Sequence, residues 1–184
     1  YEMMNYYTNL IIEGIQIDHQ IGGPTELAKI LTDSLSANKR FDEQDLRQRY
    51  LNWWKSNAFD TGPTYASVFN KIDKGMDPKL AVQKVHEEFG FNTAGCGPAH
   101  RAIPLAGMLT IPTNQLITLA KLEAKITHFD DDAGNGSAIV SMLCRYLLEG
   151  NSFEDAENLV SNNRDLKESW TKLQNAKLRP DGYV

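Results

Sequence analysis

The segment from Gly90 to Arg101 combines small residues with side chains suited to an anionic ligand. It reads Gly-Phe-Asn-Thr-Ala-Gly-Cys-Gly-Pro-Ala-His-Arg. Small residues let a ligand approach the backbone closely, and successive exposed N–H groups in such a turn form an anion-binding nest. A helix starting after this loop would direct its N-terminus at a phosphate, and Arg101 would add a charge-assisted contact. The alternative is a tight helix–helix connection with Arg101 in a structural ion pair.

A second segment, from Ile126 to Gly136, places carboxylates behind a histidine. His128 is followed by Phe129 and by three aspartates at positions 130–132. Adjacent carboxylates suit a divalent cation, which prefers oxygen ligands, but they also suit the positive end of a helix dipole. Because neighbouring side chains at a helix start point in different directions, we favour a charged, solvated helix N-terminus. His128 is either a ligand contact or a core histidine hydrogen-bonded to the backbone.

Cys96 and His100 are four residues apart, a spacing that suggests a nucleophile with its base or part of a zinc site. A catalytic thiolate needs an oriented base beside it, and a zinc site needs about four ligands at set spacings. The second cysteine, Cys144, lies far along the chain in an apolar helical run. Neither a cysteine hydrolase nor a zinc centre is therefore predicted.

Helices must position these segments, because apolar residues recur at helical spacing along nearly the whole chain. The apolar stripes lie within residues 3–11, 27–35, 46–54, 65–72, 116–126, 138–147 and 166–173. Helix starts are expected at Pro24, Asp42, Asp77-Pro78 and Ser152, and helix ends at Gly14, Gly75, Gly90 and Gly150. We find no strand pattern of useful length. The prediction is an all-α fold, one domain over 1–184, with non-helical segments at 16–24, 90–99 and 127–136.

Composition argues against several classes of function. The 184 residues include 19 Lys and Arg against 24 Asp and Glu, a net charge of −5. The resulting pI near 5.4 argues against nucleic-acid binding, which calls for a basic surface. No apolar run approaches the ~20 residues of a membrane span, and the first residues do not resemble a signal peptide. Because two cysteines form no disulfide framework, a reducing, cytoplasmic location is expected.

A set of longer motifs runs in order along the chain. They are Tyr1-Glu2, Gly23-Pro24-Thr25-Glu26-Leu27-Ala28, Phe41 to Leu46 with Trp53-Trp54, Gly95 to Arg101 with Pro104-Leu105, and Thr127-His128 with Asn135-Gly136. Together they resemble the ADP-ribosylglycohydrolase family, which includes the dinitrogenase-reductase-activating glycohydrolases. Members of this family are all-α enzymes that use a divalent metal, usually magnesium, to remove ADP-ribose from protein side chains or related acceptors.

The resemblance implies roles for individual residues. Glu2 corresponds to an acidic residue near the scissile bond, and residues 93–97 correspond to a loop that wraps the diphosphate and distal ribose. His128, backed by residues 135 and 136, corresponds to the adenosine-side wall. The implied ADP-ribose-binding residues are Thr93, Ala94, Gly95, Cys96, Gly97, Arg101, His128, Asn135 and Gly136. We therefore expect Gly95–Gly97 and His128 to line one pocket.

The main departures from the family pattern concern the metal. Where Thr-Asp-Asp is usual, this chain has Gly22-Gly23-Pro24, which offers no side-chain oxygen, and Asp18 is a weak substitute. Cys96 replaces a usual Asn, and His100 a usual Met. The family's Gly-Asp helix should precede Tyr1, and its Asp-x-Asp segment should follow the last residue, Val184. The sequence thus resembles the central portion of a longer domain or a degenerate member, and although Mg²⁺ is expected for the family, no ligand to it is assigned.

Three functions remain open. The first is metal-dependent hydrolysis of an ADP-ribosyl N- or O-glycosidic bond, with Glu2 as acid/base. The second is ADP-ribose binding without metal chemistry, and the third is a structural, crystallin-like use of the scaffold. The expected partner is ADP-ribose or an ADP-ribosylated acceptor; the acceptor and the oligomeric state stay open. For this chain by itself we expect weak ADP-ribose binding and very slow or no hydrolysis.

Overall fold

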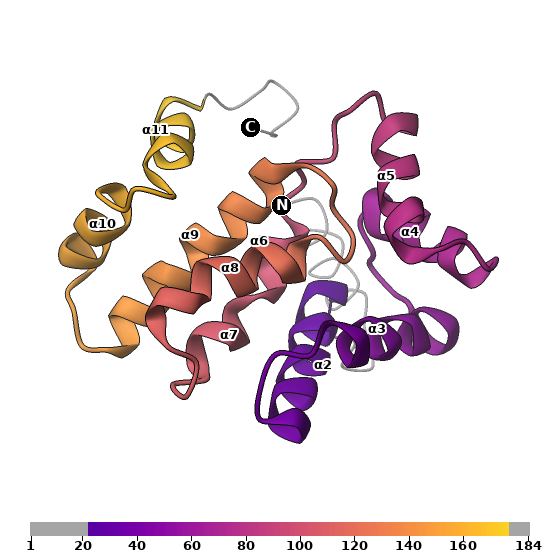
Figure 1. Cartoon of the computed structure of the whole chain (residues 1–184), viewed down its shortest axis with the longest axis horizontal. Coiled ribbons are helices and arrows are strands. Elements are labelled where there is room, and N and C mark those ends of the chain that lie inside the picture. Colours follow the sequence, from indigo (N-terminus) through magenta and orange to yellow (C-terminus); the bar gives the residue numbers. More distant parts are fainter. Residues whose placement is uncertain (1–21, 177–184) are drawn as a thin grey trace, which may run out of the picture.

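The computed structural model describes residues 22–176, which form helices joined by short loops (Figure 1). The helices are α2 (Gly23–Asn38), α3 (Glu43–Asn57), α4 (Pro63–Asp73), α5 (Pro78–Glu88), α6 (Gly97–Arg101), α7 (Ile103–Gly107), α8 (Thr113–Ala124), α9 (Asp131–Leu148), α10 (Phe153–Ser161) and α11 (Lys167–Asn175). No strand occurs within residues 22–176, so the predicted all-α fold is confirmed. None of the helices in this range is long and apolar enough to traverse a bilayer. The apolar stripe expected at residues 3–11 lies outside the described part of the chain.

The helix ends follow from the predicted caps. Asp42 and Asp77 each accept a hydrogen bond at 3.0 Å from the backbone N–H three residues on. At the start of α10, the Asp155 N–H donates to the Ser152 hydroxyl, and that hydroxyl donates to the Asp155 carboxylate. These bonds satisfy donors that a helix start otherwise leaves unpaired. Glycines with a positive φ follow three helix ends, at Gly75, Gly90 and Gly150, and Lys39 has a positive φ just past α2.

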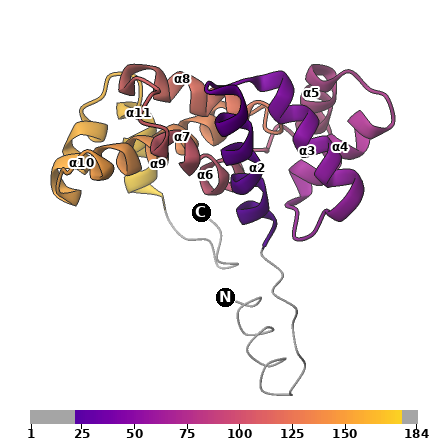
Figure 2. The same ribbon diagram turned by 90° about the horizontal axis from the view of Figure 1, so that it is seen from below.

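Helix α9 runs through the middle of the molecule, with α10 and α11 toward one end and α3 to α5 toward the other (Figure 1, Figure 2). It packs against α6, α7, α8 and α10. Small residues in its first turns allow a close approach to α8: a Cβ atom added at Gly134 would lie 3.5 Å from the Cα of Lys121. Because α9 packs against both α6 and α8, it sets the positions of these two helices relative to each other.

Two of the predicted non-helical segments are shorter than expected. Helix α6 begins at Gly97 and α9 begins at Asp131, so the prediction of a loop through 99 and through 136 is wrong at these residues. Pro98 is tolerated in the first turn of α6, where its missing N–H is not needed. The Asp130 side chain caps α9 by accepting the N–H of Asp132 at 2.9 Å. The Gly-Asn-Gly stretch at 134–136 is a poor helix former, but it is helical here, with Gly134 buried against Lys121 of α8.

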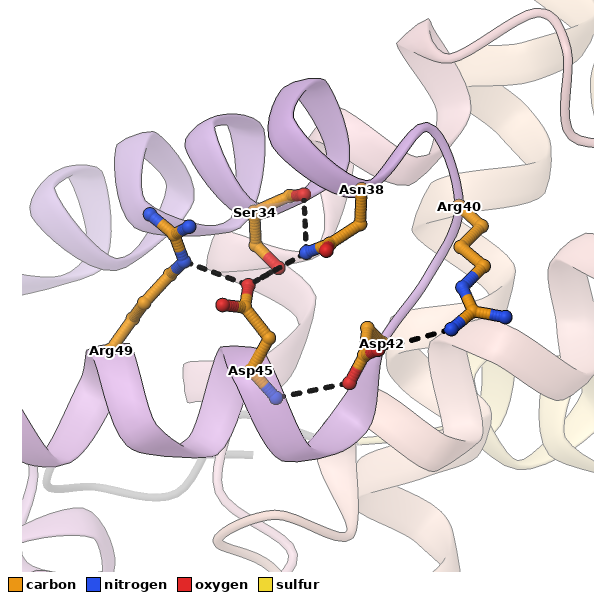
Figure 3. Close-up of polar contacts among 6 residues, drawn as sticks. All are labelled: Ser34, Asn38, Arg40, Asp42, Asp45 and Arg49. Atoms are coloured by element: carbon orange, nitrogen blue, oxygen red, sulfur yellow. Dashed lines mark hydrogen bonds and ion pairs between the residues drawn. The ribbon is translucent and has the colours of Figure 1, made fainter.

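A polar cluster joins α2 to α3 (Figure 3). Asp45 Oδ2 accepts hydrogen bonds from the Ser34 hydroxyl at 2.6 Å, the Asn38 amide at 2.9 Å and the Arg49 Nε at 2.7 Å. The bonds from Arg49 and then Ser34 hold the pKa of Asp45 below its usual value. Ser34 and Asn38 lie on α2, so two of these bonds join the last turns of α2 to the start of α3, while the bond from Arg49 lies within α3.

Arg145 of α9 secures the connection between α7 and α8. Its side chain is 2% exposed, and its guanidinium donates to four carbonyl oxygens at 2.8–3.3 Å, those of Leu105, Ala106, Met108 and Ile111. A guanidinium offers five N–H donors in a fixed plane, so one side chain satisfies several carbonyls at once. These bonds fix the segment that leads into the start of α8. The segment that contains His128 follows the other end of that helix.

Candidate functional site

The glycine loop between α5 and α6 contacts His128, which follows α8. A Cβ atom added at Gly95 would lie 3.3 Å from His128 Nε2, and one added at Gly97 would lie 3.6 Å from His128 Cε1. The absence of side chains at both positions leaves one edge of the imidazole facing the loop. The predicted proximity of residues 95–97 and His128 is therefore observed, whereas their contact with a ligand stays a prediction.

A network of buried, hydrogen-bonded side chains lies next to His128. Arg101 Nε donates to Glu123 Oε1 at 2.6 Å, and Tyr50 donates its hydroxyl hydrogen to the same oxygen at 2.9 Å. Arg101 Nη2 donates to the Thr127 hydroxyl at 2.7 Å, and that hydroxyl lies 2.7 Å from His128 Nδ1. The Arg101 and Glu123 side chains are 1% and 0% exposed. Of the two interpretations of Arg101, the structural ion pair is the one observed.

His128 is neutral in this environment. Burial of the imidazole, followed by the charge of Arg101, lowers its pKa from 6.5 to about 3. At neutral pH the ring therefore carries one hydrogen, on one of its two nitrogens. Burial and then the negative charge of Glu123 also raise the pKa of Tyr50 well above its usual value, which keeps the phenol a hydrogen-bond donor.

The other predicted loop residues differ in their exposure. Ala94, Gly95 and Cys96 are exposed, and Gly97 is half-buried. Thr93 is buried, and its hydroxyl lies 2.7 Å from Nδ1 of His86 on α5. Because Gly95 has no side chain and Ala94 only a methyl group, a ligand can approach the loop backbone there, as an anion-binding turn requires.

Asn135 and Gly136, predicted to back His128, are half-buried in the early turns of α9. The next residue, Ser137, donates its hydroxyl hydrogen to the Pro98 carbonyl at 3.3 Å. This bond places the start of α9 against α6. The two predicted residues thus lie on an element that touches the site, while Glu2, the predicted catalytic residue, lies outside the described residues.

An aromatic cluster beside the loop was not assigned by sequence reasoning. The ring centroid of His86 lies 5.4 Å from that of Phe91 and 5.0 Å from that of Phe129. Both phenylalanines are exposed, Phe91 by 69% and Phe129 by 42%. Phe91 also has a φ of 59°, which is strained for a bulky residue. The available signal was position: one phenylalanine directly follows Gly90, and the other directly follows His128.

The aspartates at positions 130–132 are occupied by helix-start contacts. Asp130 caps α9, Asp131 pairs with Lys125 at 2.6 Å and Asp132 pairs with Lys172 at 3.5 Å. Within residues 22–176, no group of three or more His, Cys, Asp or Glu side chains is arranged to hold a metal ion. The cap that Asp130 forms at the start of α9 supports the helix-start interpretation of this run.

Comparison with known proteins identifies the family of this chain. The sequence profile of a family described as ADP-ribosylglycohydrolase matches residues 7–181. A chicken (Gallus gallus) protein named ADP-ribosylhydrolase ARH3 is 25% identical over 158 residues, which cover 83% of this chain and 42% of that protein. The chain thus spans less than half the length of this relative. Because the family profile covers nearly all of the chain, the chain belongs to the ADP-ribosylglycohydrolase family.

Proposed function

We propose that this chain supplies an ADP-ribose-binding surface, formed by the loop at 92–97, His128 and the exposed rings of Phe91 and Phe129. The observation that carries the proposal is the close approach of two glycines of this loop, Gly95 and Gly97, to the buried imidazole of His128. Backbone N–H groups in the loop suit a diphosphate. A neutral imidazole suits a hydrogen bond to an uncharged or anionic oxygen, and exposed aromatic rings suit the face of a nucleobase.

The reaction proposed for the whole protein is hydrolysis of an ADP-ribosyl N- or O-glycosidic bond. Family membership supports this reaction, as does the name of the chicken relative, an ADP-ribosylhydrolase. An ADP-ribosylated acceptor is accordingly the proposed substrate. A reducing compartment such as the cytoplasm is the proposed location, because Cys96 is a free and exposed thiol of the kind that reducing conditions preserve.

Magnesium, which the resemblance implies, does not fit the residues described. Mg²⁺ is usually held through one or two carboxylates in octahedral oxygen coordination. The start of α2 offers Gly22, Gly23 and Pro24 in place of side-chain oxygens. Within 22–176, the aspartates near His128 are engaged by lysines or by the helix they cap. We therefore derive no catalytic step through a metal from these residues.

This mismatch favours a second candidate function, ADP-ribose binding without hydrolysis. Hydrogen bonds within the chain hold both parts of this surface: Thr127 contacts His128, and His86 contacts Thr93 of the loop. A hydrolysis assay on ADP-ribosylated arginine and serine peptides, with and without magnesium, separates the two functions. We expect no magnesium-dependent turnover by the 184-residue chain, and turnover at a normal enzymatic rate would contradict this expectation.

Calorimetric titration of the chain with ADP-ribose tests the binding surface itself. We expect a dissociation constant of roughly 0.1–1 mM, or about −5 kcal/mol. Gly95→Val should weaken binding about tenfold, because the added side chain would cover His128 Nε2. Gly107→Val is the matched control, since a Cβ there meets nothing within 4 Å. Equal loss in both variants, or no binding by the unsubstituted chain, would contradict the proposal.

A further inference from the structure

We infer that Arg101 and Thr127 are positioning residues that fix the tautomer of His128, so that its Nε2–H is presented to the glycine loop as a neutral hydrogen-bond donor. This inference rests on the proposed function for its ligand, but the tautomer itself is a property of the free protein. The tautomer follows from the hydrogen-bonding capacity of the buried side chains: some of their atoms can donate a hydrogen bond, and others can only accept one.

The direction of hydrogen bonding is set at Arg101. A guanidinium has donors and no acceptor, so in the 2.7 Å contact between Arg101 Nη2 and Thr127 Oγ1 the threonine oxygen accepts. The hydrogen of the threonine hydroxyl remains, and the other described partner of this oxygen is His128 Nδ1 at 2.7 Å. The hydroxyl therefore donates to Nδ1, which must be unprotonated.

The opposite tautomer would leave a hydrogen without a partner. If His128 Nδ1 carried the hydrogen, Thr127 Oγ1 would receive two donors, and its own hydrogen would point at no described acceptor. Thr127 is fully buried, and leaving a buried polar group unpaired is unfavourable. The neutral ring therefore carries its hydrogen on Nε2, the nitrogen that faces Gly95.

Further contacts hold the Arg101 guanidinium in the orientation in which it donates to Thr127. Glu123 accepts from Arg101 through its side chain at 2.6 Å and through its backbone carbonyl at 3.5 Å. The rings of Tyr50 and Tyr65 lie 5.4 and 6.0 Å from the guanidinium carbon, close enough for a cation–π attraction. Every side chain in this chain of contacts is buried, so water does not compete for the donors.

The chemistry implied for the ligand is an oxygen acceptor, either a phosphate oxygen or a ribose hydroxyl. A neutral N–H donates to both, and ADP, which keeps the diphosphate but lacks the distal ribose of ADP-ribose, tests whether that distal ribose supplies the acceptor. In this arrangement His128 offers one fixed donor and does not exchange a proton with the ligand. Loss of Thr127 would leave the imidazole buried but free to adopt either tautomer.

Nitrogen-15 NMR of the histidine side chains in the free protein tests the tautomer. We expect His128 Nδ1 to resonate as an unprotonated nitrogen and Nε2 as a protonated one, with His128→Asn assigning the signals. In Thr127→Val, which keeps the shape of the side chain, we expect signals of mixed tautomers. Thr127→Ser keeps the hydroxyl and should restore the single tautomer. A protonated Nδ1 in the unsubstituted protein, or an unchanged tautomer in Thr127→Val, would overturn the inference.

Titration with ADP-ribose and ADP gives the second readout. Thr127→Val should weaken ADP-ribose binding about tenfold, and Thr127→Ser about twofold or less. Circular dichroism must show the same helical content in both variants. If the unsubstituted protein binds no ADP-ribose, the proposed function fails, while the NMR result still decides the tautomer. Equal affinity of the valine and serine variants would refute the positioning role.

Discussion

Acidification should destabilise this protein through His128. The imidazole is 4% exposed, and burial followed by the charge of Arg101 lowers its pKa to about 3 in the folded state. In the unfolded chain the pKa returns to its ordinary value near 6.5. Between these two values the unfolded state binds a proton that the folded state does not bind, so the free energy of unfolding falls as the pH falls.

The size of the effect follows from the two pKa values. The loss of unfolding free energy caused by His128 is close to zero at pH 8, where the ring is neutral in both the folded and the unfolded state. Below pH 6.5 it grows by about 1.4 kcal/mol per pH unit, so that about 2 kcal/mol of stability is lost by pH 5. The loss would continue with further acidification until the pH reaches the folded pKa of about 3.

Urea unfolding at pH 8 and at pH 5, followed by circular dichroism, measures this loss. His128→Asn removes the titrating group, and its stability should fall about 2 kcal/mol less than that of the unsubstituted protein over the same interval. His100→Asn, at an exposed position, is the matched control and should keep the full dependence. If the unsubstituted protein and His128→Asn lose the same free energy, His128 is not held neutral in the fold and the reasoning is refuted.

Two substitutions test the packing that holds the site. Arg145→Met should destabilise the protein by about 3 kcal/mol or more, because it leaves four carbonyl oxygens without their common donor; an equilibrium urea transition within about 1 kcal/mol of the unsubstituted protein would contradict this. Gly23→Ala should cost about 2 kcal/mol, because the added Cβ would lie 2.4 and 2.5 Å from two backbone carbonyl oxygens. Gly62→Ala, where a Cβ meets nothing within 4 Å, should cost about 1 kcal/mol or less; thermal melts in which the two glycine variants coincide would show that the start of α2 can move.

The helices were predictable because their signals are local. Asp42, Asp77 and Ser152 cap the helices that the sequence assigned to them, through bonds to N–H groups three residues away. Such contacts depend on adjacent sequence and require no knowledge of the tertiary fold. The aspartates at 130–132 indicated the start of α9, but the prediction of a non-helical segment through 136 was wrong because the Gly-Asn-Gly stretch opposes a helix locally, whereas in the structure Gly134 packs against α8.

The network of polar side chains next to His128 could not be predicted from local sequence, although one feature of the sequence indicated buried charges. Tyr50 and Glu123 are 73 residues apart, and Arg101 and Thr127 are 26 apart. Nothing in local sequence pairs them. Glu123, however, lies three residues after Ala120 and three before Ile126 on an apolar stripe, and Arg145 lies three residues after Met142 on another. A charged residue at a core-facing helical position indicates a buried partner, because such a charge is rarely buried unpaired.

The close contact at the start of α2 restricts the mutations that evolution can accept there. The resemblance places the family's metal-binding Thr-Asp-Asp at residues 22–24. A side chain added at Gly22 would meet the Asp60 carboxylate at 2.9 Å, which can rotate away, whereas one added at Gly23 would meet the backbone oxygens of Phe59 and Asp60. A carboxylate at position 23 therefore requires the backbone at 59–60 to shift as well. Position 23 and the 59–60 segment must change together, so a single substitution at Gly23 cannot supply a side-chain oxygen at the start of α2 without altering the connection that leads into α4.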